Sequence, residues 1–129
     1  MTQVEQLLAR GGRQPGQLAT KVGFDAWPAI RVRPAPGWMR LLWRGPVGAM
    51  TLGSSIYVRP DLLEGDPRVL GALIAHEVVH VRQWRALGRL GFLRRYLGEY
   101  LANRRKRLGH DQAYRMISFE EEARRLSAV

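Results

Sequence analysis

Two histidines and a glutamate have a spacing that suits a metal site on a helix. His76, Glu77 and His80 form the pattern HExxH, in which the two imidazoles lie four residues apart. On a helix, residues four apart share one face, so both imidazoles can hold one metal ion. The Glu77 carboxylate would then lie beside a metal-bound water, where a general base is needed. Zinc is the usual metal, with water as fourth ligand when the site is catalytic.

The residues around the motif predict the helix that must carry it. Apolar residues recur at helical spacing at Leu70, Leu73, Ile74, Val81 and Trp84. Asp66 suits the N-cap and Pro67 the first helical position, so the helix should run from about Pro67 to about Leu87, with Gly88 ending it. The simpler alternative is an amphipathic helix that bears two surface histidines without a metal.

Two histidines rarely hold zinc alone, so a third protein ligand is expected. His110 is the only other histidine of the chain. The acids that follow the motif are Glu99, Asp111, Glu120, Glu121 and Glu122. Three consecutive glutamates suit the N-terminus of a helix, where the helix dipole favours negative charge. That role is compatible with one of them binding a metal.

The motif and the glutamates some forty residues downstream resemble the gluzincin metallopeptidases. In that family a later helix supplies a glutamate as third zinc ligand, often with a small alanine three residues after it. Aligning that alanine with Ala123 selects Glu120, and Glu122 is the alternative. The resemblance covers about residues 49–126. The small size of the chain is similar to that of the minigluzincins, which are minimal single-domain members.

The stretch HExxHxxQ, which ends at Gln83, also resembles the compact metallopeptidase-like domains of bacterial contractile-injection effectors. One position departs from the gluzincin pattern, because Arg124 stands where an aspartate often orients the first histidine. A partner must then come from elsewhere, since its loss typically costs about 10–100-fold in metal affinity or activity. Zincins usually also supply a tyrosine or histidine that stabilises the oxyanion, and the candidates here are His110 and Tyr114.

The resemblance implies a minimal zincin-like α+β fold, in which a small twisted sheet packs on the motif helix and C-terminal helices bring Glu120 to the zinc. It implies zinc-dependent peptide hydrolysis, with Glu77 as general base. In zincins the strand before the motif helix pairs with extended substrate, and here that strand is Met50 to Val58. The alternative is a metal-binding or partner-binding protein with weak or no peptidase activity.

The remaining elements follow from periodicity and turn residues. Residues 49–58 form the best strand, with Met50, Leu52, Ile56 and Val58 on one face. Before this strand, we predict a helix over 2–9, loop over 11–37 with one short strand at 29–33, and a strand or helical turn over 38–43. After the motif helix, we predict a helix over 90–108. A last helix should form in two pieces, 111–116 and 119–127, with Ser118 as N-cap of the second piece. We expect one domain over residues 1–129, in which residues 1–45 carry no recognised motif.

The composition is that of a globular domain with a strong positive charge. The chain is 46% hydrophobic and 25% charged, with a net charge of +10 and no cysteine. Any metal must therefore be held by nitrogen and oxygen ligands. The N-terminal residues do not form a signal peptide, and no stretch reaches the ~18 apolar residues of a membrane span, so we expect a cytoplasmic protein.

Much of the positive charge lies on the helix predicted over residues 90–108. Its apolar face consists of Phe92, Leu93, Tyr96, Leu97, Tyr100 and Leu101, and its other face is rich in arginine. This pattern resembles an interfacial helix that binds an anionic membrane surface. We favour the alternative that the apolar face packs in the core while arginine stems cover apolar surface. The charge could also attract nucleic acid, but no recognised nucleic-acid-binding motif supports that function.

Overall fold

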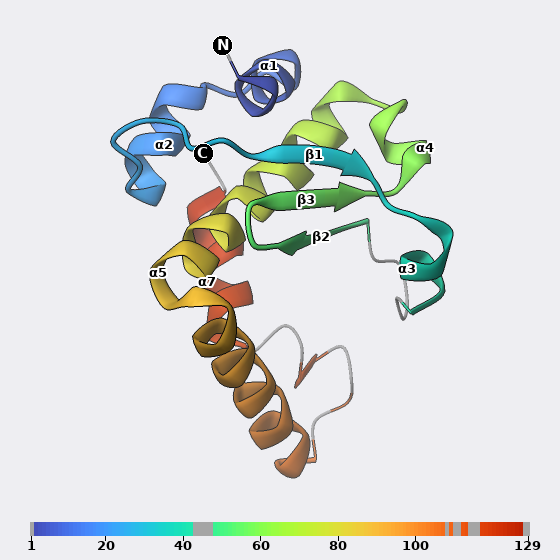
Figure 1. Ribbon diagram of the computed structural model, residues 1–129, viewed down its shortest axis with the longest axis vertical. Coiled ribbons are helices and arrows are strands. Elements are labelled where there is room, and N and C mark those ends of the chain that lie inside the picture. The colour runs from blue at the N-terminus through green and yellow to red at the C-terminus, as the bar shows by residue number, and fades with distance from the viewer. Residues whose placement is uncertain (1, 43–47, 108, 110–111, 114–116, 128–129) are drawn as a thin grey trace.

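Helix α5, Pro67–Arg105, is the central element of the fold (Figure 1). The computed structural model describes residues 2–42, 48–107, 109, 112–113 and 117–127. The Asp66 carboxylate caps the helix by accepting a hydrogen bond from the Arg68 N–H, which confirms the predicted start. Gly88 has non-helical angles, φ 73° and ψ 170°, and divides α5 at the predicted break. We call residues 67–87 the motif segment and residues 89–105 the projecting segment.

In the described part of the chain, three short strands form the sheet, in the order β1-β3-β2. They are β1 (Arg31–Pro34), β2 (Ala49–Leu52) and β3 (Ser55–Val58). Strand β1 is parallel to β3 and β2 is antiparallel to it, so β2 is an edge strand. The mixed sheet with its surrounding helices confirms the predicted α+β class.

The prediction of one continuous strand from Met50 to Val58 is wrong, because the chain reverses within it. Gly53 has φ +64° and begins a two-residue turn with Ser54, which joins β2 and β3 into a hairpin. Thr51 therefore pairs with Ile56. The reversal also changes the predicted faces: Thr51 is buried with Ile56, whereas Leu52 is exposed.

Helices replace much of the loop predicted for the N-terminal region. Helix α1 (Gln3–Arg10) confirms the helix predicted over residues 2–9. Helix α2 (Pro15–Val22) was missed: Pro15 occupies its first turn, and Gly23, with φ 97°, ends it.

The prediction for residues 38–43 resolves to a helix, α3 (Gly37–Leu42), while Trp43 lies outside the described residues. The short helix α4 (Pro60–Leu63) then precedes α5.

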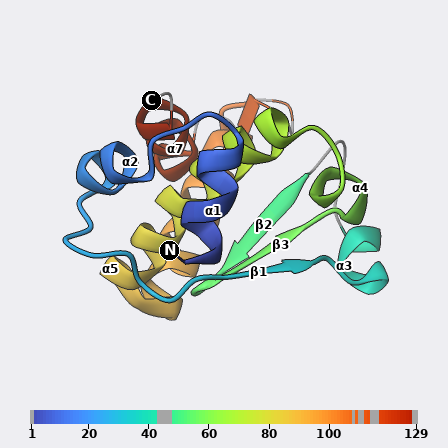
Figure 2. The ribbon, with the colours of Figure 1, turned by 90° about the horizontal axis from the view of Figure 1, so that it is seen from above.

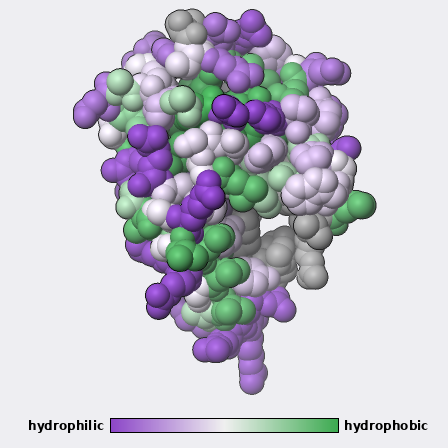
Figure 3. Space-filling view, in the orientation of Figure 1, coloured by the Kyte–Doolittle hydropathy of each residue, from purple (hydrophilic) through white to green (hydrophobic). Residues whose placement is uncertain are grey.

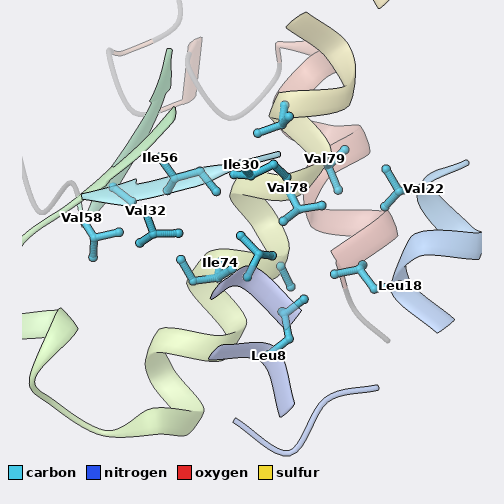
Figure 4. Close-up of a cluster of buried hydrophobic side chains, with 14 of the residues drawn as sticks. Leu8, Leu18, Val22, Ile30, Val32, Ile56, Val58, Ile74, Val78 and Val79 are labelled. Carbon is cyan, nitrogen blue, oxygen red and sulfur yellow. The ribbon is translucent and has the colours of Figure 1, made fainter. Parts of the chain in front are cut away.

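The hydrophobic core joins α1, α2, the sheet and the motif segment (Figure 4). Its fully buried side chains include Leu8, Ile56, Val58, Ile74 and Val78. Each such side chain stabilises the fold by roughly 1.5–3 kcal/mol relative to an exposed one. The first 45 residues thus contribute two helices and a strand to the core that positions the motif.

A pair of glycines lets α1 end directly against α5. A Cβ atom added to Gly71 would lie 3.0 Å from the Gly11 Cα, and one added to Gly11 would lie 2.7 Å from the Pro67 carbonyl oxygen. Side chains at either position would force the two helices apart. The position of α1 over the motif segment therefore depends on both glycines.

Helix α7 (Ser118–Ser127) confirms the helix predicted over residues 119–127 and packs against α5. The helix already includes Ser118, whose hydroxyl donates a hydrogen bond to Glu99 at 2.7 Å. Of the piece predicted over 111–116, only Gln112 and Ala113 are described, and both are helical. From above (Figure 2), the sheet lies on one side of α1, and α2 and α7 lie on the other.

None of the helices in the described parts of the chain combines the length and apolar character needed to cross a membrane.

Candidate metal centre

Three side chains from two helices converge on one point. The Nε2 atoms of His76 and His80 lie 3.3 Å apart, and each lies 3.1 Å from Oε1 of Glu120. The histidines are one turn apart on the motif segment, and α7 supplies Glu120 from forty residues later. The structure thus brings together the three residues that the gluzincin resemblance selects as ligands.

The spacing of these three donor atoms fits a tetrahedral metal ion. Bonds of about 2.0–2.1 Å from zinc to nitrogen and oxygen would place neighbouring donors about 3.3 Å apart. The observed separations are 3.1–3.3 Å. Two imidazoles and a carboxylate are also a donor set that zinc accepts. The three donors that the described residues supply are therefore compatible with zinc.

The electrostatics of the cluster favour a positive charge between the carboxylate and the imidazoles. Burial lowers the pKa of His80, but its hydrogen bond with Glu120 and the charges of Glu77 and Glu120 outweigh this and raise the pKa to about 9. Burial raises the pKa of Glu120, but hydrogen bonds from His76 and His80 hold it well below its usual range. Glu120 is a carboxylate with only 2% of its surface exposed. A metal ion and a proton would compete for Nε2 of His80.

Gln83 fixes the orientation of His80. The Gln83 Oε1 atom lies 2.7 Å from Nδ1 of His80 and accepts its hydrogen, which leaves the Nε2 lone pair for a metal. The Gln83 amide in turn donates to the Phe119 carbonyl oxygen and to Glu122, each at 3.0 Å. Glu122, the alternative third ligand, therefore bonds to Gln83, whereas Glu120 faces the imidazoles.

We predict that Gln83→Ala lowers zinc affinity about 10–100-fold, because His80 would lose the acceptor that sets its tautomer and ring angle. Competition with a metal chelator would measure the affinity. The double variant Gln83→Glu with Glu122→Gln exchanges the two groups and keeps an acceptor for Nδ1, so it should recover most of the loss. Gln17→Ala, at an exposed position on α2, is the matched control. Unchanged affinity in Gln83→Ala would contradict the positioning role.

The edge strand holds the carboxylate of the predicted general base. The Thr51 Oγ1 atom of β2 lies 2.7 Å from Oε2 of Glu77 and 3.2 Å from the Glu77 carbonyl oxygen. Both residues are buried. This contact depends on the hairpin turn at Gly53, since the turn places Thr51 on the inner face. The Glu77 carboxylate is therefore fixed in position from outside its own helix.

A cavity of about 200 Å³ opens beside this cluster. Its lining residues are Ala49, Met50, Thr51, Leu52, Glu77, His80, Trp84, Phe92, Leu93, Tyr96 and Glu120. Strand β2 and both segments of α5 thus form its walls. A mostly apolar cavity with a few convergent polar groups is typical of a binding site for a small molecule or a side chain.

The two predicted oxyanion stabilisers, His110 and Tyr114, lie outside the described residues. A different tyrosine lines the cavity: the Tyr96 hydroxyl donates to Oε2 of Glu120 at 3.3 Å. Tyr96 was predicted only as part of the apolar face of the helix over residues 90–108, and Thr51 had no predicted functional role. The hydroxyl of Tyr96, a polar group among leucines, could have indicated a functional role for that residue. The hairpin signal of Gly53-Ser54 could have indicated that Thr51 faces inward.

Comparison with known proteins identifies a family for the larger part of the chain. Residues 13–88 match the family model described as the eCIS core domain. The matched region holds the sheet and the motif segment with His76, Glu77 and His80, and it ends at the Gly88 break. Glu120 lies beyond it. Comparison with curated proteins and with solved structures gave no match.

Proposed function

The chain belongs to the eCIS core domain family, and we propose that it is a zinc-dependent peptidase of the gluzincin type. The observation that carries this proposal is the convergence of His76, His80 and Glu120 on one point, next to a cavity that Glu77, His80 and Glu120 line. The abbreviation eCIS in the family name stands for extracellular contractile injection system. The substrates we propose are therefore peptides or proteins that such a system meets.

The proposed mechanism assigns a task to each of the buried polar groups. Zinc, when bound, would polarise a peptide carbonyl and lower the pKa of a water to about 7. Glu77 would accept a proton from that water at Oε1, since Oε2 is bonded to Thr51, and would pass it to the leaving amine. As negative charge develops on the carbonyl oxygen, the Tyr96 hydroxyl would turn its hydrogen from Oε2 of Glu120 to that oxygen.

Strand β2 would hold the substrate in an extended conformation. Among the described residues β2 pairs only with β3, so its other edge can accept a peptide strand. Met50 and Leu52 of β2 line the cavity together with Trp84 and Phe92. An apolar substrate side chain would find matching surface there.

The test is metal analysis and peptide cleavage by the same preparation. Protein purified without chelator should carry about one zinc ion per chain, as a three-ligand site does, and should cleave members of a broad peptide library. A chelator should abolish cleavage and added zinc should restore it. Bound zinc without any cleavage would reduce the proposal to a metal-binding or partner-binding module, and absence of zinc binding would overturn it.

A further inference from the structure

The projecting segment of α5 carries apolar side chains that the core does not use. Leu90, Leu93, Leu97 and Leu101 recur at helical spacing, and between 43% and 81% of each is exposed. We call these four residues the leucine stripe. The projecting segment extends away from the sheet (Figure 1). In the same orientation, hydrophobic groups lie among hydrophilic ones along the lower part of the molecule (Figure 3).

A different face of the same segment packs against the rest of the molecule. Phe92 is buried and stacks on Trp84 and Phe119, with ring centroids 4.3 Å and 4.8 Å apart. Asn103 is also buried and donates to the Ala113 carbonyl oxygen at 3.0 Å. The interpretation that the whole apolar face packs in the core is therefore wrong for the leucines. The aromatic side chains make the packing contacts, and the leucine stripe faces outward beside them.

Basic side chains border the leucine stripe. Successive residues of a helix are rotated by about 100° about its axis. Arg94 and Arg105 therefore lie along one side of the stripe, and Arg104 lies at its C-terminal end. All three are exposed. Glu99 is the one acid of the segment, and its carboxylate is bonded to Ser118. The exposed side of the projecting segment is therefore both apolar and positively charged.

We propose that the leucine stripe and its bordering arginines bind an anionic membrane surface, with the projecting segment lying in the plane of the interface. Leucines would enter the acyl boundary while arginine heads reach lipid phosphates. A second copy of the chain is a less suitable partner, because each copy has a net charge of +10 and the two copies would repel each other. Nucleic acid would match the charge but would leave four leucines in water.

The membrane proposal is independent of the peptidase proposal, although the two sites adjoin. Leu93 belongs to the stripe and also lines the cavity, together with Leu52. A bilayer on the stripe would therefore lie next to the cavity mouth.

Sedimentation of the full chain with lipid vesicles tests the proposal. The wild type should bind vesicles of phosphatidylglycerol and phosphatidylcholine, and bind vesicles of phosphatidylcholine alone far less. Leu97→Ser with Leu101→Ser should weaken binding at least about tenfold, because two apolar side chains no longer leave water. Arg94→Gln with Arg105→Gln should weaken it roughly tenfold or more at low salt. Leu41→Ser on α3 and Arg10→Gln on α1, both exposed, are the matched controls.

Three results would overturn the proposal. The first is absence of wild-type binding to anionic vesicles at low salt. The second is equal binding by the leucine variant, since charge alone would then account for the attraction. The third is a wild-type dimer that the leucine variant makes monomeric, because a second copy would then cover the stripe. Thermal unfolding of each variant would establish that the exposed substitutions leave the fold intact.

Discussion

Glu77→Gln should abolish peptide hydrolysis while zinc binding stays unchanged. The amide cannot accept a proton from water, and loss of a general base typically lowers the rate about 10²–10⁴-fold. The amide oxygen can still accept the Thr51 hydroxyl hydrogen, so the cavity keeps its shape. The turnover number on a cleaved peptide, with zinc content determined on the same sample, is the measurement.

The matched control for this variant is Glu121→Gln. Glu121 is exposed on α7, so this substitution removes the same charge outside the cavity. It should cleave at the wild-type rate. If Glu77→Gln cleaves as fast as the wild type, the proton passes to another group. If it also loses zinc, Glu77 supports the metal rather than the chemistry.

Glu120→Ala should remove the metal. Among the described residues, Glu120 supplies the carboxylate that faces both imidazoles. Zinc affinity should therefore fall by more than about 100-fold, which is the most that the loss of a group that only orients a ligand typically costs. Zinc at a hundred times its dissociation constant stabilises a protein by about 2.7 kcal/mol. The wild type should therefore show a zinc-dependent rise in unfolding temperature that Glu120→Ala lacks.

Glu122→Ala separates the two glutamates that the sequence left as alternatives. Glu122 bonds to Gln83 and lies outside the donor cluster, so its loss should lower zinc affinity much less than the loss of Glu120. Loss of zinc in Glu122→Ala with retention in Glu120→Ala would contradict the assignment of the third ligand. Calorimetric titration of both metal-free variants with zinc would distinguish the outcomes.

The parts of the fold that could be predicted are those with strong local signals. Asp66 and Pro67 start α5, and Gly88 breaks it, because each of these residues restricts its own backbone or caps its neighbours. The hairpin was missed because alternation of period two continues on both sides of Gly53-Ser54. A Gly-Ser pair between two such runs is itself a hairpin signal.

In the candidate site, too, the residues that could be predicted are those with a strong local signal. HExxH places two imidazoles by helix geometry alone, and Glu120 required a resemblance because nothing local joins residue 80 to residue 120. The hydrogen bond of Gln83 to His80 depends on both side-chain rotamers and on the position of α7. Periodicity also could not distinguish buried Phe92 from exposed Leu97, because it records that a face is apolar and not what covers it.

A hydrogen bond joins the N-terminal and C-terminal regions of the described chain. The Arg13 guanidinium donates to the Ser127 carbonyl oxygen at 2.7 Å, across 114 residues of sequence. Helix α1 and the end of α7 lie at the end of the molecule opposite the projecting segment (Figure 1). A protein fused at either end would therefore emerge far from the leucine stripe. A short linker between the two regions would therefore permit circular permutation, provided that the new termini leave the hairpin turn at Gly53 intact.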